Sequence, residues 1–128
     1  MKTRRLLAVS AVLAVCGALA LPSMASDRAR SGVTIHHRGH HFYGYVFSTK
    51  PHRCARLRKV RLFKQDGKTQ DQSFNIGRTD SAATSQGNGQ YRWRVLVEDS
   101  GLNRGRFFAR IHRTAGCQED SSRTIRVR

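Results

Sequence analysis

The sequence predicts an all-β protein, a single antiparallel sandwich of about seven strands that follows an N-terminal export signal. Short runs of alternating apolar and polar residues recur between turns that contain Gly or Asp. Beyond the apolar N-terminus, the chain contains no long stretch with the periodicity of an amphipathic helix. The chain of 128 residues carries 24 Lys and Arg against 8 Asp and Glu, a net charge of +16. Such a charge indicates either an anionic partner or a strongly solvated surface.

Residues 1–25 are predicted to be a cleaved signal peptide. A basic start precedes an uncharged, apolar run at 6–21, and the small residue Ala25 suits cleavage after it. The apolar run is shorter than the roughly 20 residues that a membrane-spanning helix requires. General secretion is favoured over twin-arginine export, which the Arg4-Arg5 pair leaves open. We therefore expect a secreted protein, either periplasmic or extracellular.

The remaining chain is expected to form one domain behind a short leader. Residues 26–41 are polar and interrupted by glycine, which is typical of a mobile segment. The sandwich is expected to occupy residues 42–128. Its first three strands are predicted at 42–47, at 59–63 before an Asp-Gly turn, and, more weakly, at 73–77.

The second half of the chain contains the clearest strand signal. Gly87-Asn88-Gly89 is a turn of the kind that leads into a hairpin. It precedes 91–97, where apolar side chains alternate with arginines. Two further alternating runs, 106–112 and 124–128, complete the set. Short strands separated by turns at such regular intervals favour an antiparallel sandwich.

Two cysteines, Cys54 and Cys117, remain after signal cleavage. In an oxidising compartment an even pair predicts a disulfide. Closing a loop of roughly 60 residues should stabilise the fold by about 4 kcal/mol in the chain-entropy model. A metal-binding or catalytic pair is the alternative, and the disulfide is favoured because a domain this small buries little apolar surface.

Several spaced motifs carry a resemblance to a known fold family. They are Phe42-x-Gly44-x-Val46, Val60-x-Leu62-Phe63, Thr79-Asp80, Gly89-Gln90-Tyr91-x-Trp93 and Gly105-x-Phe107-x-Ala109-x-Ile111. On these residues, the run 42–128 resembles the transthyretin-like, carboxypeptidase-regulatory class of immunoglobulin-like sandwiches, especially short cysteine-containing versions in secreted bacterial proteins. The resemblance implies an immunoglobulin-like fold. Because its motifs are structural, it implies no particular chemistry.

Arginines alternate with apolar residues in several of the predicted strands. If the apolar side chains point inward, the basic side chains between them point outward. The candidate anion-binding residues are Arg61, Arg92, Arg94, Arg106, Arg110 and Arg126. We expect these residues of neighbouring strands to form one continuous cationic face. Because guanidinium groups match carboxylates and phosphates in forked geometry, such a face could hold anionic envelope polymers, lipid headgroups or nucleic acid. The alternative is a solvated surface whose charge maintains solubility and protects edge strands from pairing.

Two further side-chain groups stand out near the start of the domain. The histidines of the leader, His36, His37, His40 and His41, could bind zinc, copper or nickel through their ring nitrogens. Arg38 lies among them and no carboxylate is near, so a metal-binding protein is kept as the alternative function. Tyr43, Tyr45 and Phe47 are expected on the outward side of the first strand. They would either stack on nucleobases or sugar rings, or be covered by the leader or a neighbouring strand.

The sequence offers little support for catalysis. It contains no nucleophile elbow, paired carboxylates, phosphate-binding loop or zinc-hydrolase motif, and its acidic residues, among them Asp80, are expected mostly at turns. We therefore predict a noncatalytic module that contacts an anionic polymer or a membrane surface. No cofactor is expected. The sequence indicates neither a small-molecule substrate nor specific recognition of nucleic acid.

Overall fold

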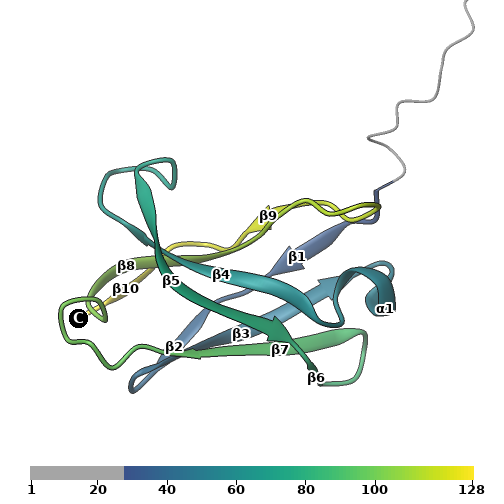
Figure 1. Ribbon diagram of the computed structural model, residues 1–128, viewed down its shortest axis with the longest axis horizontal. Helices are drawn as coiled ribbons and strands as arrows, with labels where there is room; N and C mark the ends of the chain where they lie inside the picture. Colours follow the sequence, from purple (N-terminus) through teal and green to yellow (C-terminus); the bar gives the residue numbers. More distant parts are fainter. Residues whose placement is uncertain (1–27) are drawn as a thin grey trace, which may run out of the picture.

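Two antiparallel β-sheets make up the fold in the computed structural model, which describes residues 28–128 (Figure 1). The first sheet contains β1 (Ser31–Val33), β2 (His36–Arg38), β3 (His41–Ser48), β6 (Thr84–Ser85) and β7 (Gln90–Leu96), in the order β1-β3-β7-β6 with β2 paired to β3. The second contains β4 (Arg58–Gln65), β5 (Ser73–Ala82), β8 (Gly105–Ile111), β9 (Asp120–Ser121) and β10 (Ile125–Val127), in the order β10-β8-β4-β5 with β9 paired to β8. The predicted all-β sandwich is confirmed. The predicted signal peptide, 1–25, lies outside the described residues.

One apolar core lies between the sheets, and strands of both contribute to it. Phe42 in β3 and Phe107 in β8 are fully buried, and their ring centroids are 4.6 Å apart across the two layers. Leu62 in β4 is also fully buried in this core. The inward side chains are therefore the ones that the alternating pattern predicts.

Gly44 gives the indole of Trp93 its place in the core. Gly44 in β3 is the register partner of Trp93 in β7, and Trp93 Nε1 donates a hydrogen bond to the carbonyl oxygen of Thr34 at 3.0 Å. A Cβ atom on Gly44 would lie 1.9 Å from that carbonyl oxygen and 2.8 Å from the indole nitrogen. The close approach of these three segments therefore requires glycine.

Within the described residues, most of the segment predicted as a mobile leader is instead part of the first sheet. β1 pairs with β3, with Ser31 opposite Ser48, and β2 pairs with the other end of β3. Val33 and Ile35 are 5% and 1% exposed, so this segment contributes to the core. The prediction was wrong because these two apolar side chains, two positions apart, are enough to anchor an edge strand among polar neighbours.

The long strand β5 links the two sheets. It runs past the predicted end at residue 77 and leads toward β6, which belongs to the first sheet (Figure 1). Asp80 lies in β5 and not at a turn, and its Oδ2 accepts a hydrogen bond from the backbone N–H of Arg94 in β7 at 2.7 Å. One acidic side chain thus joins the sheets.

Among the described residues, no helix is long and apolar enough to span a membrane, and α1 covers Pro51–Cys54.

Candidate anion-binding surfaces

The six candidate arginines lie on two different sheets. Arg92 and Arg94 belong to β7 of the first sheet, whereas the other four belong to β4, β8 and β10 of the second. The outer faces of a two-layer sandwich point in opposite directions. The prediction of one continuous cationic face is therefore wrong. Alternation distinguishes inward from outward side chains, but it does not assign a strand to a sheet.

The second sheet carries what we call the arginine face, defined by Arg61, Arg106, Arg110 and Arg126. Arg61 is the register partner of Arg110, and Arg106 is the partner of Arg126. The cross-strand rows that contain these pairs continue through Ser121, Thr79, Gln65 and Ser73. Neither row contains an acidic residue. Like charges directly opposite each other destabilise a sheet, so this arrangement lowers fold stability unless other contacts or a ligand offset it.

Contacts with aromatic rings hold Arg110 in place. Its guanidinium carbon lies 5.1 Å from the ring centroid of Phe63 and 5.3 Å from that of Phe108, and its Nε donates to Ser121 Oγ at 2.9 Å. The two rings stack with centroids 5.3 Å apart. Phe108 is fully buried although it does not belong to the central core cluster. Such cation–π contacts are worth about 0.5–2 kcal/mol and partly offset the repulsion between arginines.

Arg61 is positioned by His112, at the edge of the same face. A terminal guanidinium nitrogen of Arg61 lies 2.9 Å from His112 Nδ1. Arginine has no acceptor, so this contact requires an unprotonated Nδ1. Partial burial, together with the charges of Arg61 and Arg110, lowers the pKa of His112 below its usual value, whereas Glu119 opposes the shift. The positive field of this face therefore already affects a neighbouring titratable group.

The first sheet carries a second basic region, the tyrosine–arginine groove. This open groove of about 520 Å³ is lined by Arg38, Gly39, His41, Tyr43, Tyr45, Arg92 and Arg94. Tyr43 is opposite Arg94 and Tyr45 is opposite Arg92 in the register of β3 and β7. The Arg92 guanidinium carbon is 5.0 Å from the Tyr43 ring centroid, and the His36 ring stacks on Tyr43 at 5.3 Å.

The aromatic residues predicted to face outward differ in how far they are covered. Tyr43 and Tyr45 are half-buried, in part because His36 of β2 lies against both rings. Phe47, the third member, is 43% exposed. The predicted covering therefore holds in part, since the first two rings are partly covered and the third is open, and stacking on nucleobases or sugar rings stays a prediction.

The four histidines do not converge on one site. His36 and His37 are adjacent in β2 and so face opposite sides: His36 stacks on Tyr43, and the His37 ring is 4.7 Å from that of Phe42. His40 lies beyond them, with Nδ1 3.4 Å from the side-chain nitrogen of Asn103. Within residues 28–128, no group of three or more His, Cys, Asp or Glu could hold a metal ion. The predicted histidine metal site is therefore not formed: strand alternation separates His36 from His37, His40 lies in the turn between β2 and β3, and His41 lines the tyrosine–arginine groove.

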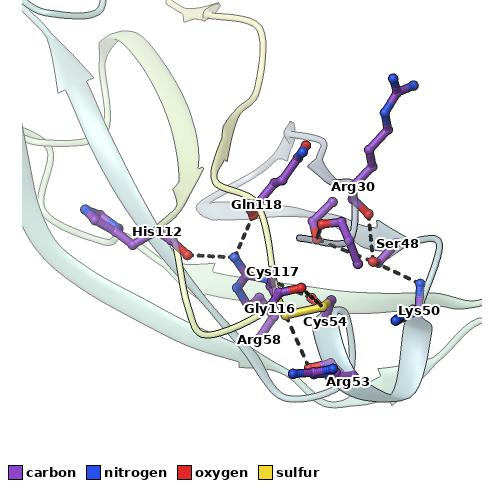
Figure 2. The surroundings of a disulfide bond; sticks show 12 residues. Arg30, Ser48, Lys50, Arg53, Cys54, Arg58, His112, Gly116, Cys117 and Gln118 are labelled. Atoms are coloured by element: carbon purple, nitrogen blue, oxygen red, sulfur yellow. Dashed lines mark hydrogen bonds between the residues drawn. A yellow bond between two sulfur atoms is a disulfide. The ribbon is translucent and has the colours of Figure 1, made fainter. Parts of the chain in front are cut away.

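The disulfide between Cys54 and Cys117 is confirmed, with the two Cα atoms 5.5 Å apart (Figure 2). It joins α1, just before β4, to the segment that precedes β9, across a sequence separation of 63 residues. Both residues are buried together with Ala29 in a cluster separate from the main core. The bridge thus fixes a corner of the domain that lies outside the main apolar core.

A buried arginine that the sequence interpretation missed lies beside this bridge. Arg58 is 6% exposed, and its guanidinium donates hydrogen bonds to the carbonyl oxygens of Cys54 at 2.9 Å, His112 at 2.6 Å and Gln118 at 2.8 Å (Figure 2). Burial lowers the pKa of Arg58. A signal was present, because Arg58 has the same strand parity as the inward-facing Val60 and Leu62.

Few carboxylates are available to neutralise the basic surfaces. Among the described residues, the single ion pair joins Arg113 to Glu119 at 3.2 Å, and both side chains are exposed. Asp120 Oδ2 accepts a hydrogen bond from the backbone N–H of Val33, as Asp80 does from that of Arg94. These acidic side chains therefore serve as backbone acceptors and leave the arginines uncompensated.

No protein-family profile, curated protein or solved structure gives a significant match to this chain. What the structure shows is an all-β fold of two antiparallel sheets with a disulfide. The transthyretin-like resemblance stays a prediction from sequence motifs.

Proposed function

We propose that this protein is a secreted, noncatalytic, immunoglobulin-like module that binds anionic polymers or membrane surfaces outside the cell through its arginine face. One observation carries the proposal: four arginines form two facing pairs on one sheet, in rows without an acidic residue. The predicted signal peptide and the disulfide support export, since disulfides persist in oxidising compartments.

Repulsion within the two arginine pairs is only partly offset by other contacts in the structure. Arg61 faces Arg110 and Arg106 faces Arg126, and like charges in such positions destabilise a sheet by up to about 1 kcal/mol per pair. Bound carboxylate, sulfate or phosphate groups would relieve that repulsion and would form forked hydrogen bonds with the guanidinium groups. The ligand should therefore raise the stability of the folded protein as well as bind to it.

The shape of the site favours an extended ligand over a small molecule. The two arginine pairs lie on the outer face of a sheet, on opposite sides of the stacked rings of Phe63 and Phe108. Repeated anionic groups along a polymer, or lipid headgroups in a membrane, can engage both pairs at once.

Binding of heparin and of vesicles containing anionic lipid, measured across a range of salt concentrations, tests this proposal. Arg106→Gln with Arg126→Gln removes one facing pair, whereas Arg56→Gln with Arg104→Gln removes the same charge from exposed positions outside the face. We expect at least about fivefold weaker binding in the first variant than in the second. We also expect the slope of the logarithm of the binding constant against the logarithm of the salt concentration to become shallower by roughly 0.7–0.9 per lost contact, as for nucleic acids.

Equal losses in the two double variants would contradict the proposal and leave the arginine face as solubilising charge. The same conclusion would follow if binding of the unmodified protein disappeared below about 0.15 M salt, where the screening length is still about 8 Å.

A further inference from the structure

The tyrosine–arginine groove lies on the other sheet from the arginine face and has its own chemistry. We propose that it binds one acidic sugar unit, a uronic acid or a sulfated residue, within a polysaccharide. The inference rests on the proposed function for the anionic nature of the ligand. It uses none of the four residues of the arginine face, so the two sites can be tested separately.

The lining of the groove combines cations with aromatic rings. Three arginines, one histidine and two tyrosines line it, together with Gly39, and none of these residues is acidic. Its volume of about 520 Å³ lies within the range of roughly 300–1,000 Å³ typical of small-ligand sites. Asp80 lies on the far side of Arg92 and Arg94, in an adjoining hollow of about 360 Å³. An anionic ligand would therefore avoid Asp80 by occupying the tyrosine side.

Arg92 is both held in place and incompletely satisfied. Its guanidinium lies 5.0 Å from the Tyr43 ring centroid, and its Nε is buried without a hydrogen-bond partner. Buried polar atoms in folded proteins nearly always have a partner, so this N–H is a donor in need of an acceptor. A carboxylate or sulfate oxygen bound beside Arg92 in the groove would supply that acceptor.

Arg94 supplies a second, exposed guanidinium on the same face. It lies two positions from Arg92 in β7, roughly 6.5 Å along the strand. The backbone N–H of Arg94 donates a hydrogen bond to Asp80 Oδ2 at 2.7 Å, while the Arg94 side chain is exposed. One arginine can thus engage the acidic group of a sugar while the other engages the next charge along the polymer.

The tyrosines favour a sugar over a nucleobase. Tyr43 has His36 at 5.3 Å and Arg92 at 5.0 Å as ring partners, whereas Tyr45 has only the more distant edge contact with His36 at 6.3 Å among the aromatic and cation–π contacts of the described residues, so its ring has more room for a ligand. Proteins that bind single-stranded nucleic acid stack successive bases on several aromatic side chains. A single ring suits one sugar ring, and a phenol hydroxyl can both donate to and accept from sugar hydroxyls.

The test uses the full mature protein and three defined probes: tetragalacturonate, its methyl-esterified neutral form, and an oligothymidylate of equal charge. Binding is measured by calorimetry and by NMR shift perturbation at about 0.15 M salt. Arg92→Gln with Arg94→Gln alters the groove, and Tyr45→Val removes its ring while keeping a strand-forming residue. Arg56→Gln with Arg104→Gln is the control, Arg106→Gln with Arg126→Gln separates the groove from the arginine face, and thermal unfolding checks that every variant folds.

We expect tetragalacturonate to bind at least about tenfold more weakly to both groove variants and less than twofold more weakly to Arg56→Gln with Arg104→Gln. The loss in Arg106→Gln with Arg126→Gln should be smaller than in either groove variant. The neutral ester should bind at least tenfold more weakly than the acid. Equal affinity for the ester, or equally tight binding of the oligothymidylate with the same dependence on Arg92 and Arg94, would overturn the inference.

The two proposals fail in different ways. If Arg106→Gln with Arg126→Gln weakens tetragalacturonate as much as the groove variant does, the sugar site is wrong and the arginine face stands. If only the groove variant weakens both heparin and tetragalacturonate, the sugar site stands and the function proposed for the arginine face is wrong.

Discussion

The guanidinium of Arg58 donates a hydrogen bond to the carbonyl oxygen of Cys54, one partner of the disulfide, at 2.9 Å. The same guanidinium bonds to Gln118, the residue that follows the other disulfide cysteine, at 2.8 Å. Arg58 therefore bridges the two segments that the disulfide also joins (Figure 2). The disulfide and the buried guanidinium therefore both hold these two segments together at this corner of the domain.

Arg58→Met should destabilise the protein strongly. The substitution keeps an apolar stem but leaves up to three carbonyl oxygens without their donor, and each buried unsatisfied group costs about 1–3 kcal/mol. We expect a loss of about 3 kcal/mol or more in the free energy of unfolding, measured in urea. Arg56→Met, at an exposed position two residues earlier, should change it by less than about 0.5 kcal/mol. Similar losses in the two variants would show that Arg58 is not structural.

Replacing both Cys54 and Cys117 with alanine should lower the free energy of unfolding by about 4 kcal/mol, because the bridge closes a loop of 63 residues. Alanine suits these buried positions better than serine, which would bury a hydroxyl group. Reduction of the unmodified protein should have a comparable effect in chemical denaturation. A loss below about 1 kcal/mol, or two free thiols by mass in secreted protein, would contradict the structural role of the bridge.

The effects of Arg58 and the disulfide should not add. Both restrain the same two segments, so once one is removed the other acts on a looser structure. A double-mutant cycle that combines Arg58→Met with the double alanine variant should give a coupling energy of about 0.5–3 kcal/mol. Strict additivity would indicate that the hydrogen bonds and the bridge stabilise independent parts of the domain.

Gly44→Ala should disturb the environment of the single tryptophan. Its Cβ would lie 1.9 Å from the carbonyl oxygen of Thr34, which accepts the indole hydrogen bond of Trp93, so the strand or the indole must move. We expect a loss of about 1–3 kcal/mol and a shifted fluorescence maximum. In Gly32→Ala the three atoms nearest to the new Cβ all belong to the ring of Phe47, which is 43% exposed and can move away. An unchanged spectrum and stability in Gly44→Ala would refute the steric argument.

The protein should lose stability as the pH falls from about 7.5 to 5.5. Burial lowers the pKa of His37 and of His112 from the value of 6.5, so in this window the unfolded chain binds more protons than the folded one. The free energy of unfolding should therefore fall as the pH drops through 6.5 and level off below the folded pKa values. His37→Gln with His112→Gln should flatten this dependence, whereas His52→Gln, at an exposed position, should not. Parallel pH profiles for the protein and the double variant would contradict the assignment.

Local features of the sequence determined the fold class and the direction of most side chains. Alternation in β4, β7 and β8 predicted that Leu62, Trp93 and Phe107 are buried and that the arginines between apolar residues point outward. The two cysteines predicted their bridge because the predicted signal cleavage leaves one possible pair. These inferences succeed because strand periodicity is a property of a few consecutive residues.

Only the tertiary structure decided which strands share a sheet. It separates Arg92 and Arg94 from the other four arginines, places the segment around Ile35 in the core, and directs His36 and His37 to opposite faces. It also buries Arg58, to which the sequence analysis assigned no role, as a hydrogen-bond donor. Pairing between strands depends on contacts between residues far apart in the chain, and the alternating pattern of a single strand carries no information about its neighbour.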